Sequence, residues 1–314
     1  MQHTEAGLLR ERKRRRLMGR LKLFLMISPF IAMIAVFSYY PLYGWIYAFY
    51  DFKPPRSLAQ SDFVGLQWFK LLVSNSVRVN QLLEVLRNTF AISGLGILTS
   101  WVPILFAILL AQAPSKRMKR LVQTFTTLPN FISWVLVYSF AFALFSSTGA
   151  ANTVLMRLGL TDAPILFLQK NDHTWLSMLL WSMWKGTGWG AIMYLAALAG
   201  IDPELYDAAK VDGAGRFRLI WHVDLPGLVP TYFVLLLLGV ANFLNNGFDQ
   251  YFVFQNAFNA SKIQVLDLYV YNLGIGSGSY SIATAVSIMK SIVSLTLLFT
   301  CNGLSKLVRG ETII

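Results

Sequence analysis

The feature that most constrains this chain is a series of long apolar runs that contain few or no charged residues. The six runs are Leu23 to Tyr50, Asn88 to Ser115, Leu121 to Met156, Trp175 to Gly200, Leu228 to Phe248 and Ser281 to Leu304. Four of them carry no charge, and the fourth and sixth carry one lysine each, Lys185 and Lys290. A helix that crosses a bilayer needs about 20 predominantly apolar residues. Each run is therefore long enough to span a membrane.

The overall composition excludes a soluble globular domain. Hydrophobic residues make up 55% of the chain and charged residues only 13%, which leaves too little polar surface for a soluble protein of 314 residues. The first apolar run is too long for the core of a signal peptide, so we expect it to be retained as a helix. We predict an all-α membrane protein with six transmembrane helices, near 22–50, 84–113, 121–146, 174–200, 228–249 and 281–305.

The positive charges are concentrated in alternate connections. Eight of the 27 Lys and Arg residues lie between Arg10 and Lys22, and four more lie in the sequence SKRMKR between the second and third runs. Further basic residues follow the fourth and sixth runs. By the positive-inside rule, both termini and these two inner connections face the cytoplasm of a multi-pass protein in the cytoplasmic (inner) membrane. This distribution disfavours nucleic acid as the partner of a chain with net charge +12.

The outer connections are too short to form separate domains. We expect three parts: a basic cytoplasmic tail at 1–21, a transmembrane domain at 22–305 and a short cytoplasmic tail at 306–314. Within the transmembrane domain, the connection at 201–227 is the longest polar interruption on the inner side.

That inner connection has the local signals of a helix followed by a corner. In IDPELYDAAKVDGAGRF, Asp202 is a good N-cap and Pro203 suits the first helical position. Gly213 follows the helical segment and can adopt a positive φ. We predict a short helix, a glycine corner and a second short helix over Arg216 to His222. An ordinary connecting helix pair would give the same pattern.

The spacing in this segment resembles the EAA motif of the permeases of binding-protein-dependent ABC importers. The family pattern is Glu-Ala-Ala, three residues, Gly, nine residues, Ile, one residue and Leu-Pro. This chain has Asp207-Ala208-Ala209, then Gly213, then Val223-Asp-Leu225-Pro226. It departs from the pattern with Asp for Glu and Val for Ile. The segments YYPLYGWIYAFYDF, NTFAISGLG and LPNFISWVLV also resemble permeases that import oligosaccharides and polysaccharides, of the alginate or aldouronate type.

The resemblance implies a type I importer permease fold in which the EAA segment is a coupling helix that docks on an ATPase subunit. Ala208, Ala209 and Gly213 would allow close approach of the two backbones. Asp207, Asp212 and Arg216 would contact the ATPase. Phe217 would pack against the inner ends of the helices.

The implied partners are a second homologous permease, two ATPase subunits, an external solute-binding protein and a carbohydrate. The chain lacks the G-x-x-x-x-G-K-[ST] loop that binds nucleotide phosphates. We therefore expect no cofactor, metal or catalytic residue here, and ATP and Mg on the ATPase subunits.

Polar residues inside the spans are candidates for the substrate path, because they are costly in a membrane. Lys185 lies near the middle of the fourth span with Trp184 and Trp189, and it could pair with a uronate while the indole rings stack on sugar faces. Hydrogen bonding of Lys185 to a neighbouring helix is the simpler alternative. Further candidates lie at i, i+3, i+4 and i+7 in the fifth span, where a helix would place them on one face: Asn242, Asn245, Asn246 and Asp249. Interhelical hydrogen bonds are the alternative for these.

Three other classes of protein remain to be compared with the importer. An ion-coupled secondary transporter would need carboxylates in the middle of the membrane, and the sequence offers only Asp249 near an outer end. A membrane enzyme would need a catalytic or metal-binding set, but His3, His173 and His222 lack metal-ligand spacing. An ABC importer permease for a non-sugar solute would share the EAA segment.

Overall fold

The computed structural model describes residues 2–169 and 172–309. Within these residues the regular structure is helical, apart from an isolated antiparallel bridge between Tyr50 and Phe63. The α-helices are α1 Gln2–Ile34, α2 Gln67–Ser74, α3 Ser76–Leu98, α4 Val102–Ala111, α5 Lys116–Thr127, α6 Trp134–Phe145, α7 Ala150–Arg157, α8 Thr174–Ala199, α9 Pro203–Val211, α10 Arg216–Leu219, α11 Leu225–Ala241, α12 Asp249–Phe254, α13 Ala260–Ile263, α14 Leu266–Tyr271 and α15 Tyr280–Arg309. The predicted all-α class is confirmed.

Five helical segments in the described part of the chain are long and apolar enough to cross a membrane: Leu17–Phe49, Ser76–Ala111, Trp134–Arg157, Arg216–Ala241 and Tyr280–Lys306. The predicted fourth span corresponds to α8, which has 26 residues but is not among the five. Its tryptophans, its glycines and Lys185 lower its mean hydropathy. The predicted number of six spans therefore stays a prediction.

The first helix is longer than the sequence indicates. The predicted tail at 1–21 and the start of the first span are one continuous helix, α1, from Gln2 to Ile34. A π-helical turn and a 3₁₀ segment, Tyr40–Phe49, continue it to the first connection. At the other end α15 reaches Arg309, and residues 310–314 of the predicted C-terminal tail lie outside the described residues.

Two predicted continuous helices are interrupted. The helix predicted at 121–146 divides into α5 and α6, separated by the 3₁₀ turn Leu128–Phe131, which contains Pro129. The helix predicted at 84–113 divides into α3 and α4 at residues 99–101. Both interruptions lie beside a proline, which lacks the backbone N–H that a helix interior needs.

The helices pack through three clusters of buried apolar side chains. One joins the 3₁₀ segment Tyr40–Phe49 to α2, α3, α14 and α15, the second joins α3, α6, α8, α12, α13 and α14, and the third joins α4, α8 and α11. Helix α8 contributes to two clusters, and its Gly188 lies against the backbone of α5 at the Thr126 carbonyl, where a Cβ atom would clash. Small residues allow this close approach of helices in membranes.

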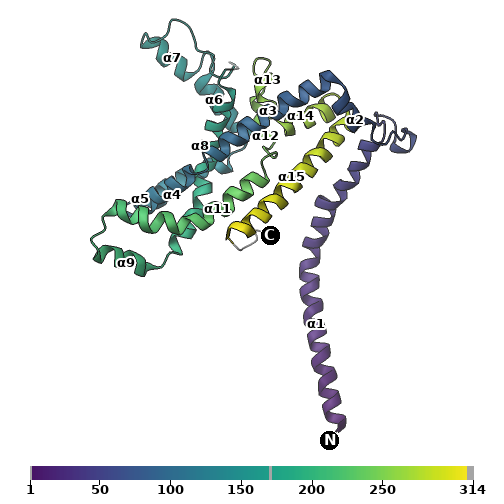
Figure 1. Ribbon diagram of the computed structural model, residues 1–314, viewed down its shortest axis with the longest axis vertical. Helices are drawn as coiled ribbons and strands as arrows, with labels where there is room; N and C mark the ends of the chain where they lie inside the picture. The colour runs from purple at the N-terminus through teal and green to yellow at the C-terminus, as the bar shows by residue number, and fades with distance from the viewer. Residues whose placement is uncertain (1, 170–171, 310–314) are drawn as a thin grey trace.

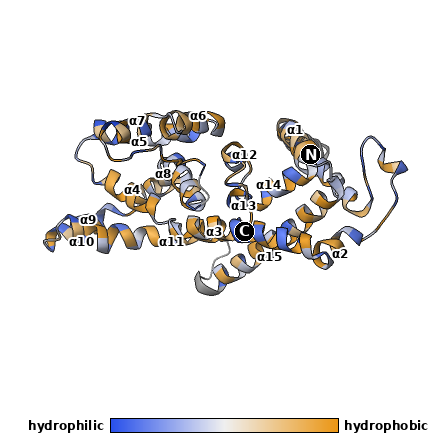
Figure 2. Ribbon diagram, turned by 90° about the horizontal axis from the view of Figure 1, so that it is seen from above, coloured by the Kyte–Doolittle hydropathy of each residue, from blue (hydrophilic) through white to orange (hydrophobic). Residues whose placement is uncertain are grey.

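Helix α1 lies outside these clusters. It runs away from the bundle in Figure 1, and none of its described side chains is buried. In the same view, α9 and the start of α1 lie on the lower side of the molecule, whereas α2, α7 and α13 lie on the upper side. Figure 2 shows that α4 and α11 are predominantly hydrophobic along their length.

Candidate functional site

The segment from Asp202 to Asp224, here called the elbow, joins α8 to α11. The Asp202 carboxylate accepts a hydrogen bond from the backbone N–H of Glu204 at 2.9 Å, and Pro203 is the first residue of α9. Gly213 has φ +72°, and the space around it is open, so its backbone conformation rather than crowding requires glycine. The predicted cap, short helix and glycine corner are confirmed.

The second half of the elbow differs from the prediction. Instead of a separate short helix at Arg216 to His222, α10, a π-helical turn at Ile220–Asp224 and α11 form one helical stretch, Arg216–Ala241. Pro226 lies just after the π-helical turn Ile220–Asp224, where the Leu225 N–H bonds to the Ile220 carbonyl and the usual α-helical hydrogen-bond pattern is already replaced. The elbow is therefore one short helix followed by a corner that leads directly into the long helix.

The elbow exposes both charged and large apolar side chains. Asp207, Ala208, Asp212 and Arg216 are exposed, Ala209 is half-buried, and Lys210 donates to Asp207 at 2.9 Å. The expected packing of Phe217 against the helix ends is wrong, because its side chain is 88% exposed. Three other apolar side chains of the elbow are also exposed: Leu205, Val211 and Trp221. Such a surface is typical of a protein-binding site.

One residue of α9 points toward the bundle instead. The Tyr206 hydroxyl donates to Oδ1 of Asp224 at 2.5 Å, and Nε2 of Gln112 donates to Oδ2 of the same carboxylate at 3.2 Å. Burial and this hydrogen bond raise the pKa of Tyr206 well above its usual value. The sequence analysis missed this contact. The sequence feature that could have indicated this contact is Asp224, a carboxylate between Val223 and Leu225 in an otherwise apolar part of the motif.

Lys185 of the predicted fourth span forms hydrogen bonds to a neighbouring helical segment, as the simpler interpretation of this residue expects. Nζ of Lys185 donates to the carbonyl oxygens of Asn130 at 2.7 Å and Pro129 at 3.3 Å, and it lies 5.4 Å from the ring centre of Trp134. These carbonyls belong to the interruption between α5 and α6. The Pro129 carbonyl also accepts a hydrogen bond from the backbone N–H of Ile132 at 3.1 Å, so Lys185 adds a side-chain donor to this interruption.

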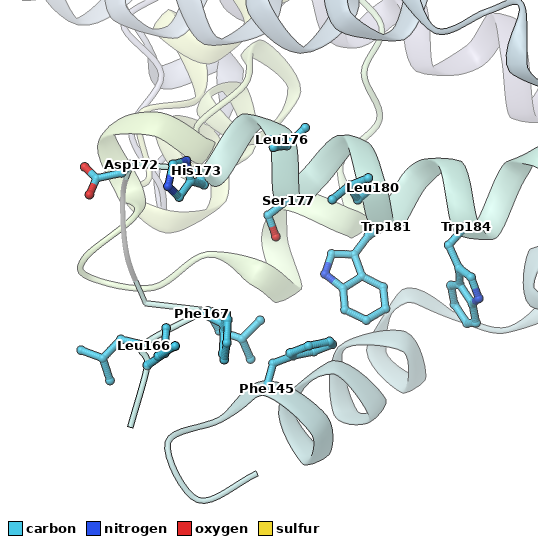
Figure 3. Close-up of a pocket in the computed structure, with 12 residues that line it drawn as sticks. Phe145, Leu166, Phe167, Asp172, His173, Leu176, Ser177, Leu180, Trp181 and Trp184 are labelled. Carbon is cyan, nitrogen blue, oxygen red and sulfur yellow. The ribbon is translucent and has the colours of Figure 1, made fainter. Parts of the chain in front are cut away.

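The two candidate tryptophans beside Lys185 lie in different surroundings. Trp184 stacks on Phe140 with ring centres 6.2 Å apart, whereas Trp189 meets Phe131 edge-on at 5.6 Å. Trp184 also lines a cavity of about 640 Å³, shown in Figure 3. There Trp181 lies beside Phe145, Trp184 lies next to Trp181 along α8, and Phe167 approaches from the connection that precedes α8. The volume is within the range of about 300–1,000 Å³ that is usual for ligand pockets.

The polar residues predicted in the fifth span lie where the helix has already ended. Helix α11 stops at Ala241 and α12 starts at Asp249, so residues 242–248, here called the break, are not helical. The predicted common helix face is therefore wrong. Asn242 donates to the carbonyl of Leu238 at 3.0 Å, and Asn245 donates to the side chain of Asn242 at 3.2 Å. Both amides and Asp249 are exposed.

The rest of the break is attached to other helices by polar contacts. Nδ2 of Asn246 donates to Ser93 of α3 at 2.8 Å, and Ser93 donates to the carbonyl of Phe243 at 2.5 Å. The Gly247 N–H donates to Oδ2 of Asp267 at 3.1 Å. The carbonyl oxygen of the Asn246 side chain is buried and has no partner among the described residues.

Lys290, the single charged residue of the sixth apolar run, forms an ion pair with Asp267, and the two side chains are 15% and 21% exposed. Asp267 lies in the predicted outer connection, so sequence distance concealed the pair. Asp224 and Asp267 are both largely buried carboxylates that the sequence analysis did not identify, and both have hydrogen-bond donors.

Comparison with known proteins places this geometry in context. The family described as binding-protein-dependent transport system inner membrane component matches residues 103–308. Protein LplB of Bacillus subtilis (strain 168) is 39% identical over 90% of this chain and 88% of its own length. The polygalacturonan/rhamnogalacturonan transport system permease protein YteP of the same organism is 35% identical, over 96% of this chain and 94% of its own.

Two solved structures have the same fold. One is a bacterial ABC transporter involved in the import of the acidic polysaccharide alginate, with a TM-score of 0.81 and 32% identity over 94% of this chain and 99% of that chain. The other is a bacterial alginate ABC transporter in complex with an alginate pentasaccharide-bound periplasmic protein, with a TM-score of 0.82 and 31% identity, covering 95% and 98%. Residues 2–169 and 172–309 contain no group of three or more His, Cys, Asp or Glu side chains that could hold a metal ion.

Proposed function

Because the chain belongs to the binding-protein-dependent transport system inner membrane components, we propose that it forms, with a second homologous permease, the path for an oligosaccharide or polysaccharide in an ATP-driven importer. As a member of this family it is a multi-pass transport permease of the cytoplasmic membrane and not an enzyme. The observation that carries the proposal is the elbow, a short capped helix that exposes apolar side chains beyond the end of the bundle.

The elbow is the surface for an ATPase subunit. Exposed apolar side chains supply the buried centre of a protein interface, and charged residues form its rim. Phe217 and Val211 are the central apolar contacts, with Asp207, Asp212 and Arg216 around them. Two ATPase subunits would bind ATP and Mg, one against this elbow and one against that of the second permease.

The second permease covers α1. The helical segment Leu17–Phe49 has the composition of a span. Its end packs against the bundle at Ala48, but none of the described side chains of α1 is buried. Cytoplasmic placement of both termini follows from the basic residues near them. The elbow and the start of α1, which lie on one side of the molecule, are then cytoplasmic, and α2, α7 and α13 face the external solute-binding protein.

The carbohydrate contacts the break and the aromatic cavity. Asn242 and Asn245 present amides that can both donate to and accept from sugar hydroxyls. Trp184 offers an aromatic face for the apolar side of a sugar ring. Lys290 is paired with Asp267, whereas Lys185 donates to two neutral carbonyls, so its charge can still pair with a uronate. The names of YteP and of the alginate transporter support a polysaccharide-derived substrate.

Reconstitution tests this function. We would place the chain in proteoliposomes with its partner permease, its ATPase subunits and its binding protein, and measure uptake from a panel of neutral and uronate oligosaccharides. We expect ATP-dependent uptake of at least one, and none with a non-hydrolysable ATP analogue. Uptake driven by an ion gradient without ATP, or ATP-dependent uptake of non-sugar solutes alone, would contradict the proposal.

A further inference from the structure

The elbow helix α9 has few attachments to the rest of the bundle. Along its length only Tyr206 and Ala209 are even half-buried, and the other side chains are exposed. The ion pair between Lys210 and Asp207 lies within the helix and on its surface. Tyr206 is therefore the residue that joins α9 to other elements by a side-chain hydrogen bond in the described part of the chain.

The partner of Tyr206 is a carboxylate that is almost completely buried. Asp224 is 2% exposed and lies in the π-helical turn that starts the long helix Arg216–Ala241. A buried carboxylate is strongly unfavourable unless hydrogen bonds compensate it. Each of its oxygens accepts one hydrogen bond, from Tyr206 at 2.5 Å and from Gln112 at 3.2 Å. Hydrogen bonds to a charged group are stronger than those between neutral groups.

The second donor connects a different helix. Gln112 follows the last residue of α4, and the preceding residue, Ala111, accepts a hydrogen bond from Lys119 of α5. Four elements therefore meet at one polar cluster: α4, α5, α9 and the start of α11. A cavity of about 400 Å³ borders this cluster, and its polar lining residues are Gln112, Lys119, Gln123, Tyr206 and Asp224. The cavity leaves space for these side chains to shift when the elbow moves.

We propose that the hydrogen-bonded joint Tyr206–Asp224–Gln112 transmits the displacement of α9 to α4 and α11, and that Tyr206 is a positioning residue for coupling. This inference rests on the proposed function, because the elbow must be moved by an ATPase subunit. The apolar residues of the elbow bind that subunit, whereas the joint carries the movement inward. Without the joint, α9 could follow the ATPase while the membrane helices stayed in place.

The variant Tyr206→Phe keeps the aromatic ring and removes the hydroxyl. We expect the ratio of ATP hydrolysed to sugar transported to rise roughly ten-fold, the factor that a hydrogen bond to a charged group typically represents. Hydrolysis itself should stay within about two-fold of wild type, since the ATPase contact surface is unchanged. If Tyr206 has a purely structural role, the variant should instead lower hydrolysis, transport and thermal stability together and leave the ratio of ATP hydrolysed to sugar transported constant. This result would overturn the proposal.

Two further variants sharpen the test. Asp224→Asn keeps an acceptor for Tyr206 but loses the charge, so the ratio should rise less than in Tyr206→Phe. Tyr280→Phe removes a phenolic hydroxyl at the start of α15, outside the joint, and should transport like wild type. A wild-type ratio in Tyr206→Phe would also overturn the proposal.

A measurement of geometry separates the joint from the proposed function. Spin labels at Lys210→Cys and Leu109→Cys, in a Cys301→Ser background, report the distance between α9 and α4 in the assembled complex. We expect a narrow distance distribution with Tyr206 and a clearly broader one with Tyr206→Phe. Distance distributions of equal width in wild type and Tyr206→Phe would contradict the proposed role of the joint, even if ATP-dependent uptake is observed. A broader distribution in Tyr206→Phe without any uptake would contradict only the proposed transport function.

Discussion

The two ends of α11 carry polar segments that are arranged in opposite ways. At the elbow, the apolar side chains face outward and the polar joint of Tyr206 with Asp224 is inside. At the break, Ser93 and Asp267 hold the backbone from inside, while the amides of Asn242 and Asn245 are exposed. An exposed apolar surface suits a protein partner, and exposed amides suit a hydroxylated ligand. Under the proposed function, α11 connects the surface for the ATPase subunit to the surface for the sugar.

The ion pair of Lys290 with Asp267 supports the break, because Asp267 also accepts a hydrogen bond from Gly247. Removing this ion pair should reduce stability more than any change at the elbow. We expect Lys290→Met to destabilise the assembled complex by roughly 3 kcal/mol, because it leaves Asp267 mostly buried without its cation. Thermal unfolding in detergent measures this change. The double variant Lys290→Met with Asp267→Asn should recover much of the loss. Lys53→Met, which breaks an exposed pair with Asp51, is the control and should cost well under 1 kcal/mol.

The elbow should show the reverse pattern, with assembly affected and stability unchanged. We expect Phe217→Asp to weaken binding of the ATPase subunit by about 2 kcal/mol, or roughly 30-fold, because a central apolar contact becomes a charge. Titration of the ATPase subunit against the purified permease pair measures the affinity. An unchanged dissociation constant would show that the exposed ring is not part of that interface.

The glycine corner allows a smaller and more specific test of the elbow. Gly213→Ala places a side chain at φ +72°, which costs about 1–2 kcal/mol, and we expect transport to fall up to about ten-fold. Gly215→Ala is the matched control, because Gly215 has φ −76° and open space around it. Equal transport by both variants would mean that the corner can change conformation without affecting coupling.

The smallest expected effect is that of pH on the joint. The pKa of Tyr206 is raised in the folded chain. The stabilisation from its protonated hydroxyl is therefore complete below the unfolded-state pKa of about 10, and it is lost only as the pH rises through the higher folded-state pKa. Between pH 6 and pH 9 we therefore expect no change from this group in the α9–α4 distance distribution. Broadening within that range, in the absence of unfolding, would contradict the assignment of the hydroxyl as the donor.

The sequence predicted those features that depend on neighbouring residues. Apolar runs indicated membrane helices, and the cap at Asp202 and the corner at Gly213 are local signals that the structure confirms. The break was not predictable, because its backbone is satisfied by Ser93 and Asp267, which are distant in sequence. Helical periodicity cannot reveal such partners.

The contacts of two individual side chains were not predictable for the same reason. The sequence does not show that a helix interruption near residue 130 supplies two carbonyl acceptors to Lys185, and the pairing of this lysine with a uronate stays a prediction. Phe217 was expected to be packed because an apolar residue near helix ends usually is. Its exposure fits the proposed contact with an ATPase subunit, and a single sequence contains no information about that second chain.

The unburied first helix has a consequence for biosynthesis. If the second permease covers α1 as proposed, a copy inserted into the bilayer before that partner is available presents α1 to lipid on all sides and completes its packing only on association. Surplus subunits should then be substrates for membrane proteases, and cellular levels of the two permeases should match even when their synthesis does not.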